Sequence, residues 1–118
     1  MIKVKIHTTP NNSSLSLSIR GHAGAAEVGQ DLVCASASIL AYTLAQLIKD
    51  YANKDMLKGK AKILMRKGSS TITCIPKEEY WETIAYTFYV IQTGLNLLAH
   101  NYPQYIVMTE MLDIGVTP

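Results

Sequence analysis

Two residues suited to thiol chemistry, His22 and Cys34, stand on either side of a short glycine-rich stretch. A neighbouring imidazole can take the proton of a thiol and later give it to a leaving group, and the thiolate is a strong nucleophile. The pair therefore predicts nucleophilic attack by Cys34 with His22 as the base.

A helix is expected to place this cysteine, because apolar residues fall at helical spacing from Asp31 to about Tyr51. With Asp31 as the N-cap, Cys34 would lie in the first turn, where free N–H groups and the helix dipole stabilise thiolates and can bind an oxyanion. Asp31 thus has two candidate roles, capping the helix or orienting His22, and the sequence leaves both open.

The stretch between the pair contains Gly24 and Gly29, and Gly21 precedes it. Glycines and small alanines offer few anchoring contacts, so residues 23–30 are predicted to form a lid that orders on substrate. Further along the helix, a row of small residues would let a substrate or another backbone approach closely: Cys34, Ser38, Ala41 and Ala45.

Simpler interpretations compete with this one. A helical cysteine is more often a small core residue than a nucleophile. A metal site is disfavoured because only His22, Cys34 and Asp31 cluster, without C-x-x-C or H-x-x-x-H spacing, so we expect no metal and no cofactor. Cys74, in an apolar strand, is expected to be structural, as are the isolated His7 and His100.

Length and composition predict one domain over residues 1–118. The chain is 48% hydrophobic and 17% charged, which suits a folded core. Its N-terminus alternates apolar and charged residues, unlike a signal peptide, and no uninterrupted apolar run approaches the ~18 residues of a membrane span. We therefore expect a cytoplasmic protein with two reduced cysteines.

The elements follow from hydrophobic periodicity. Alternating apolar positions predict a hairpin within residues 2–20, a second hairpin at 61–75 turning at K-G-S, and a last strand near 105–112. Helical spacing predicts helices over about 31–51 and 77–101, the second buried on two sides. The order β-β-α-β-β-α-β gives an α+β (α/β layered) fold, with two helices packed on a mostly antiparallel sheet.

Charge is unevenly distributed, although the net charge is only +2. Between residues 54 and 67 only Asp55 opposes a cluster of cations: Lys54, Lys58, Lys60, Lys62, Arg66 and Lys67. A solvated loop and strand face is the favoured interpretation. An RNA partner is the minor alternative, and we expect no nucleic acid because RNA-binding aromatic motifs are missing.

One long motif resembles a known family. The run G-H-A-x(5)-G-x-D-L-V-C-A-x-x-S is similar to the signature of the ribosomal-processing cysteine protease (Prp) family, and the element order and Y-P-x-Y-I ending fit that family over nearly the whole chain. It is carried by Gly21, His22, Ala23, Gly29, Asp31, Leu32, Val33, Cys34, Ala35 and Ser38. Val28 stands where many relatives carry an aromatic residue.

The resemblance implies a small homodimeric cytoplasmic endopeptidase of Firmicutes and related bacteria. Such enzymes remove a short N-terminal extension from large-subunit ribosomal protein number twenty-seven, cutting after two phenylalanines and before a small residue. It implies Cys34 as nucleophile, His22 as base and Asp31 as a third catalytic member. Candidate substrate-binding residues are Gly21, Ala23, Gly24, Gly29 and Ser38. Two alternatives remain: a non-catalytic ribosome-assembly factor, and a thiol hydrolase of a non-peptide substrate.

Overall fold

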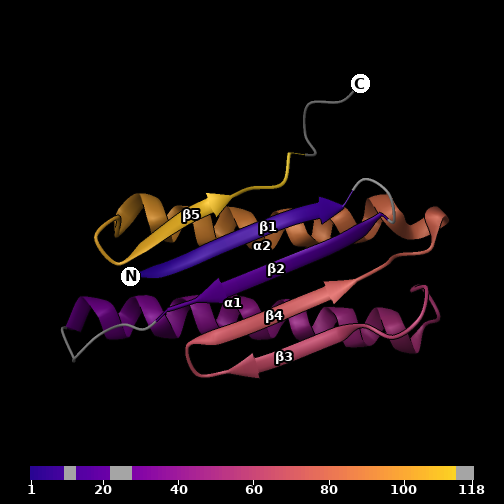
Figure 1. Cartoon of the computed structure of the whole chain (residues 1–118), viewed down its shortest axis with the longest axis horizontal. Helices are drawn as coiled ribbons and strands as arrows, with labels where there is room; N and C mark the ends of the chain where they lie inside the picture. Colours follow the sequence, from indigo (N-terminus) through magenta and orange to yellow (C-terminus); the bar gives the residue numbers. More distant parts are fainter. Residues whose placement is uncertain (10–12, 22–27, 114–118) are drawn as a thin grey trace.

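Two helices pack on one face of a five-stranded sheet (Figure 1). The computed structural model describes residues 1–9, 13–21 and 28–113, with only the backbone for residues 28–31. Its elements are β1 (Ile2–Thr9), β2 (Ser14–Arg20), α1 (Val28–Asn53), β3 (Lys62–Arg66), β4 (Ser69–Cys74), the short 3-10 helix η1 (Glu78–Tyr80), α2 (Trp81–Asn101) and β5 (Ile106–Glu110). The predicted β-β-α-β-β-α-β order and layered α+β fold are confirmed.

The strand order in the sheet is β3-β4-β2-β1-β5. Neighbouring strands are antiparallel except for β1 and β5, which are parallel with an irregular register between Val4 and Lys5. Alternation of side chains along each strand explains why one face can be apolar and the other polar. Ile2, Val4 and Ile6 are buried under the helices, whereas Lys3 and Lys5 are exposed on the opposite face.

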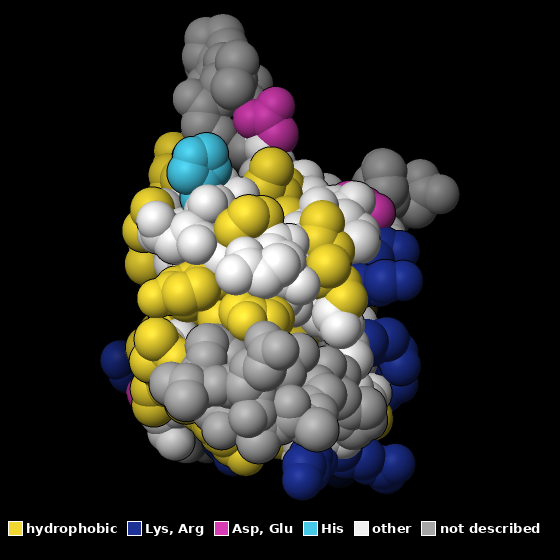
Figure 2. Space-filling model, turned by 90° about the vertical axis from the view of Figure 1, so that its left-hand side faces the viewer, with side chains coloured by type: hydrophobic (Ala, Val, Ile, Leu, Met, Phe, Trp, Pro, Cys, Tyr) yellow, Lys and Arg dark blue, Asp and Glu magenta, His cyan; other side chains and the backbone are white. Residues whose placement is uncertain are grey.

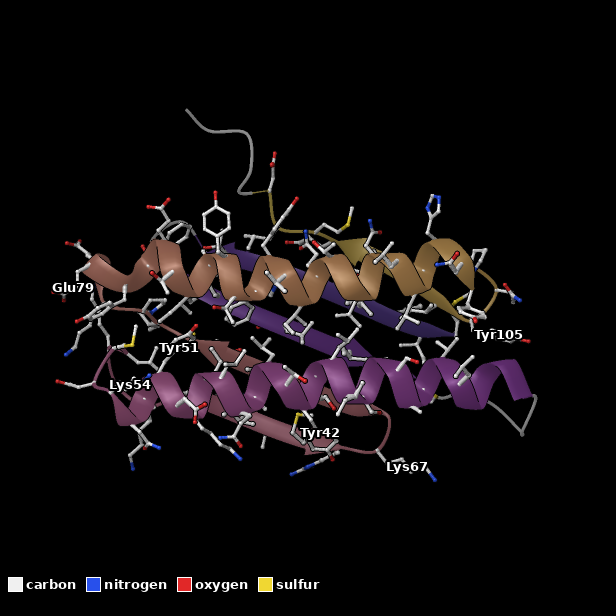
Figure 3. All side chains as sticks on the ribbon, turned by 180° about the vertical axis from the view of Figure 1, so that it is seen from behind. Tyr42, Tyr51, Lys54, Lys67, Glu79 and Tyr105 are labelled. Carbon is white, nitrogen blue, oxygen red and sulfur yellow. The ribbon has the colours of Figure 1, made fainter. Side chains whose placement is uncertain are left out.

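The core lies between the sheet and the helices (Figure 3). The predicted stripe of α1 is confirmed at Val33, Ala37, Leu44 and Ile48, which are buried in this layer. From α2, Ile84, Phe88 and Leu95 complete it. Burial of large apolar side chains at roughly 1.5–3 kcal/mol each makes this layer the main source of stability.

Three expectations about the helices need correction. The first helix begins at Val28 and not after Asp31, so Asp31 is not its N-cap, and residues 28–30, expected in the lid, belong to α1. Among the described residues, the second helix is buried on one side only, because Tyr86, Val90 and Leu97 on its other side are exposed.

A further feature of α1 concerns membrane spans. Leu32–Asn53 is long and apolar enough to cross a membrane by length and composition alone. Its apolar residues are interrupted by polar ones, so it contains no uninterrupted apolar run of that length. A core helix passes the same test, and here the apolar stripe of α1 is packed on the sheet.

Candidate active site

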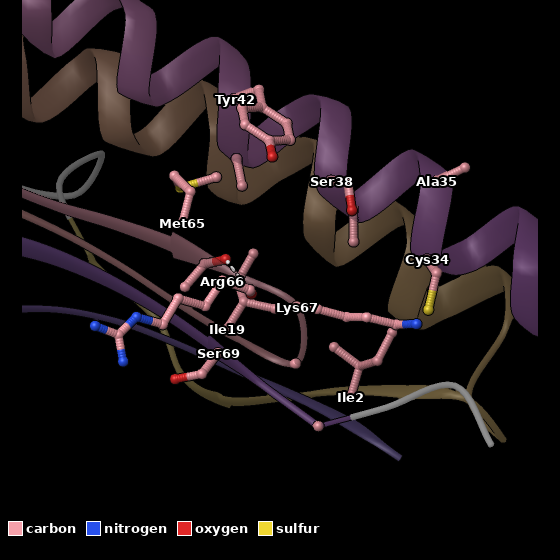
Figure 4. Close-up of a pocket in the computed structure, with 15 residues that line it drawn as sticks. Ile2, Ile19, Cys34, Ala35, Ser38, Tyr42, Met65, Arg66, Lys67 and Ser69 are labelled. Carbon is pink, nitrogen blue, oxygen red and sulfur yellow. Dashed lines mark hydrogen bonds between the residues drawn. The ribbon is translucent and has the colours of Figure 1, made fainter.

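A cavity of about 560 Å³ lies between α1, the turn joining β3 to β4, and the adjacent ends of β1 and β2 (Figure 4). This volume falls within the range of roughly 300–1,000 Å³ common for small-molecule and peptide side-chain sites. Its lining is mixed, and the residues are Ile2, Ile19, Gly21, Cys34, Ala35, Ala37, Ser38, Ala41, Tyr42, Met65, Arg66, Lys67, Gly68, Ser69 and Ser70.

Cys34 lies on the wall formed by α1 and is half-buried. Ser38, one helical turn later, is exposed on the same wall, as expected for residues four apart on a helix. Ala41 continues this wall, so the predicted row of small residues lines the cavity as far as Ala41, while Ala45 packs in the core. The small side chains leave the space that the cavity occupies.

The position of Cys34 within α1 differs from the prediction. Because the helix begins at Val28, Cys34 lies in its second turn, about 9 Å along the axis from the first residue. The free N–H groups of a helix belong to its first turn, and the dipole effect falls off within that turn. The predicted stabilisation of the Cys34 thiolate by the helix start and the predicted oxyanion binding there are therefore both wrong.

The opposite wall is the tip of the β3–β4 hairpin, which carries Met65, Arg66, Lys67 and Ser69. Figure 4 shows Lys67 extending from the turn beneath the α1 wall. The predicted K-G-S turn correctly located this hairpin. No local pattern indicates that its tip faces Cys34, since that position depends on the pairing of β4 with β2.

Gly21 connects the end of β2 to the hairpin tip. Its N–H donates a hydrogen bond to the carbonyl of Gly68 at 3.0 Å, which fixes the end of β2 against the hairpin tip. Its φ is +116°, and a Cβ there would lie 2.2 Å from the carbonyl oxygen of Met1. Only glycine fits these two conditions, and the residue that follows it in the sequence is His22.

The other predicted site residues are placed as follows. His22, Ala23 and Gly24 lie outside the described residues. Gly29 and Asp31 lie in the first turn of α1, where only the backbone is described. Of the predicted set, the structure thus brings Gly21, Cys34 and Ser38 to one cavity.

The second cysteine has a different environment. Cys74 is 2% exposed in the core, and burial raises the pKa of its thiol from 9.0 to about 12. A group with this pKa is protonated at neutral pH and is therefore a poor nucleophile. Cys34 is the thiol with access to a cavity.

These features define a class of protein: a small α+β domain with a helical cysteine on the wall of a mixed cavity. The family model of the cysteine protease Prp matches residues 1–107, and the chain belongs to this family of cysteine proteases. No curated protein matches the chain.

Solved structures share the fold. SMU.848 from Streptococcus mutans superposes with a TM-score of 0.68 at 23% identity, covering 96% of each chain. The essential ribosomal processing protease Prp from S. aureus, in complex with a covalently linked product peptide, gives a TM-score of 0.67 at 19% identity, covering 94% of this chain and 100% of that chain. The same protease with a substrate peptide gives 0.66 at 18% identity, with the same coverage.

Proposed function

We propose that this cysteine protease processes a ribosomal protein by removing the short N-terminal extension of large-subunit ribosomal protein number twenty-seven. The observation that carries the proposal is the half-buried Cys34 on the wall of a cavity large enough for peptide side chains. The S. aureus protease of the same fold is a ribosomal processing enzyme that takes peptides.

In the proposed mechanism, the Cys34 sulfur attacks the scissile carbonyl carbon while His22 takes the thiol proton. Collapse of the tetrahedral intermediate breaks the C–N bond, and His22 returns the proton to the leaving amine. Water then hydrolyses the thioester and restores the thiol. Asp31, which is not the N-cap of α1, is proposed to orient His22.

The cavity lining supports a substrate with both apolar and polar groups. Ile19, Ala41, Tyr42 and Met65 provide an apolar part suited to a phenylalanine side chain. The exposed Ser38 hydroxyl, one turn from Cys34, is placed to hydrogen-bond a peptide backbone. We propose that the apolar part selects the residue before the scissile bond.

Mass spectrometry of the extended ribosomal protein before and after incubation tests this proposal. The expected result is one cut after the phenylalanine pair, lost when both phenylalanines are replaced by alanine in the substrate. An intact ribosomal protein with the wild-type enzyme would refute this substrate. If no peptide bond is cut in any extended ribosomal protein, a non-catalytic assembly factor or a hydrolase of another substrate would be favoured.

We also propose that the enzyme is a cytoplasmic homodimer. Apolar side chains project from the helices on the side away from the sheet: Leu32, Ile39, Tyr86, Val90 and Leu97. An exposed set of this kind is typical of a protein interface. Light scattering should give about 26 kDa, twice the 13.0 kDa of the chain, and Val90→Glu should shift it toward the monomer. A monomer for the wild-type protein at micromolar concentration would contradict the dimer.

A further inference from the structure

The face of the sheet that the helices leave uncovered is basic. Alternation along the strands places five cations on it: Lys3, Lys5, Arg20, Lys62 and Arg66. All five are exposed. Figure 2 shows Lys and Arg gathered along the right-hand edge, where this face of the sheet lies, while hydrophobic side chains occupy the side of the helices. Only two of these cations belong to the basic segment at 54–67, so the surface is assembled by the fold.

Strand register arranges the cations in rows with hydroxyl groups. One row crosses four strands through directly paired positions: Lys3, Arg20, Ser69 and Arg66. With strands about 4.8 Å apart, it spans about 14 Å. The next row contains Ser18 and Thr71, which are half-buried. In the row after it, Ser16 is buried and hydrogen-bonded to Thr73 at 2.8 Å, so this pair is not counted among the groups open to a ligand. Cations and hydroxyls together are the groups that contact phosphate oxygens.

Little negative charge offsets these cations. Among the residues of the five strands, Glu110 is the one acidic side chain, and it pairs with Lys5 at 3.7 Å. The strands therefore carry a net charge of +4, whereas the whole chain carries +2 and the remainder −2. This separation of charge gives the uncovered face a positive field that attracts polyanions.

We propose that this open face binds RNA through its phosphates without reading the bases. The five strands contain no Phe, Tyr or Trp, so they lack the aromatic side chains on which RNA-binding sheets stack bases. The face is also poor in apolar anchors: among the strand positions that project from it, the large apolar side chains are Leu64 and Val107, on the two edge strands. An acidic peptide needs such anchors for specific docking, which favours a nucleic-acid backbone.

The open face borders the cavity, because Arg66 and Ser69 belong to both. RNA bound there would bring the cavity close to proteins that accompany the RNA. The proposal does not depend on which peptide is cleaved, and RNA binding is measured without any protease assay.

The test compares two triple variants of equal charge. The face variant combines Lys3→Gln, Arg20→Gln and Lys62→Gln, and the control combines Lys49→Gln, Lys54→Gln and Lys58→Gln on exposed sites elsewhere. Each removes three cations and lowers the net charge from +2 to −1. None of the six residues lines the cavity, so cleavage of a short peptide should be unchanged in both, which also verifies the fold.

Fluorescence anisotropy with labelled oligo(U) and oligo(A) of about 20 nucleotides, from 50 to 200 mM KCl, supplies the measurement. The wild-type protein should bind both equally, and log affinity should fall linearly with log salt. The face variant should bind at least tenfold more weakly, with a salt slope reduced by about 2, from roughly 0.7 per lost phosphate contact. The control should stay within about threefold of wild type.

Three results would overturn the proposal. One is the absence of binding by the wild-type protein at 50 mM KCl. Another is an equal loss in the two triple variants, which would indicate net charge alone. The third is competition by polyglutamate as effective as that by RNA, which would assign the face to an acidic protein partner.

Discussion

Replacement of Gly21 by alanine tests how the cavity is held together. The new Cβ would lie 2.2 Å from the Met1 carbonyl oxygen and 3.2 Å from the Ile2 Cα, both backbone atoms that cannot rotate away. Its φ of +116° lies in a region that L-residues rarely adopt. Backbone strain of about 1–3 kcal/mol adds to about 1–3 kcal/mol of overpacking. We expect Gly21→Ala to lower the free energy of unfolding by about 2–6 kcal/mol.

Gly59→Ala is the matched control. Gly59 also has a positive φ, +68°, but a Cβ there meets nothing within 4 Å, so only the backbone strain of about 1–2 kcal/mol applies. Urea unfolding of both variants, followed by circular dichroism, separates steric overlap from strain. Where the Gly21 variant folds, its hydrogen bond to Gly68 should weaken and peptide cleavage should fall. A loss of stability no larger than that of Gly59→Ala would refute this account of the cavity.

Three further predictions concern buried polar groups and thiols. Gln92→Leu should lower the free energy of unfolding by about 2–4 kcal/mol, because the buried Gln92 amide pairs with the N–H and carbonyl of Leu112 at 2.6 and 2.8 Å. In the same urea titration, Gln46→Leu at an exposed site should stay within about 0.5 kcal/mol of wild type. Burial raises the pKa of the Cys74 thiol from 9.0 to about 12, so the contribution of this thiol to stability is complete below pH 9 and is lost as pH rises to 12. Between these pH values, the free energy of unfolding of the wild type should fall by about 1.4 kcal/mol per pH unit more than that of Cys74→Ala. Equal pH slopes for the two proteins would contradict the burial argument. Iodoacetamide at pH 7 should label Cys34 and leave Cys74 unmodified until unfolding, as read by peptide mapping, and equal labelling of the folded protein would contradict the difference in burial.

Local sequence patterns were sufficient to predict which strands and helices form, but not the residues at which they begin and end. Strict alternation predicted β1, β2 and both hairpins, because the apolar side chains of the strands pack on the core and the polar ones alternate with them. The start of α1 was placed three residues late, because Asp31 is a good N-cap by type and the preceding V-G-Q has no apolar periodicity. Helix ends depend on backbone hydrogen bonds that such patterns report poorly.

The candidate site also has a part that local patterns predict and a part that they do not. Cys34 and Ser38 could be predicted to share a wall, since they are one turn apart on the same helix. The position of Met65, Arg66 and Lys67 on the opposite wall of the cavity could not be predicted. It depends on the strand order of the sheet, which brings the β3–β4 turn next to α1. The basic open face could not be predicted either, because strand pairing is what places Lys3, Arg20 and Lys62 on one face of the sheet.

Cleavage of one extended ribosomal-protein substrate by cysteine variants tests the proposal that Cys34 is the nucleophile. Wild type, Cys34→Ala and Cys74→Ala are each verified as folded by circular dichroism, and cleavage is followed by mass spectrometry. Cys34→Ala should cut at least a thousandfold more slowly, because no thioester can form. Cys74→Ala should lose some stability and retain turnover within about twofold. Undiminished cleavage by folded Cys34→Ala, or its loss in folded Cys74→Ala, would contradict the assignment.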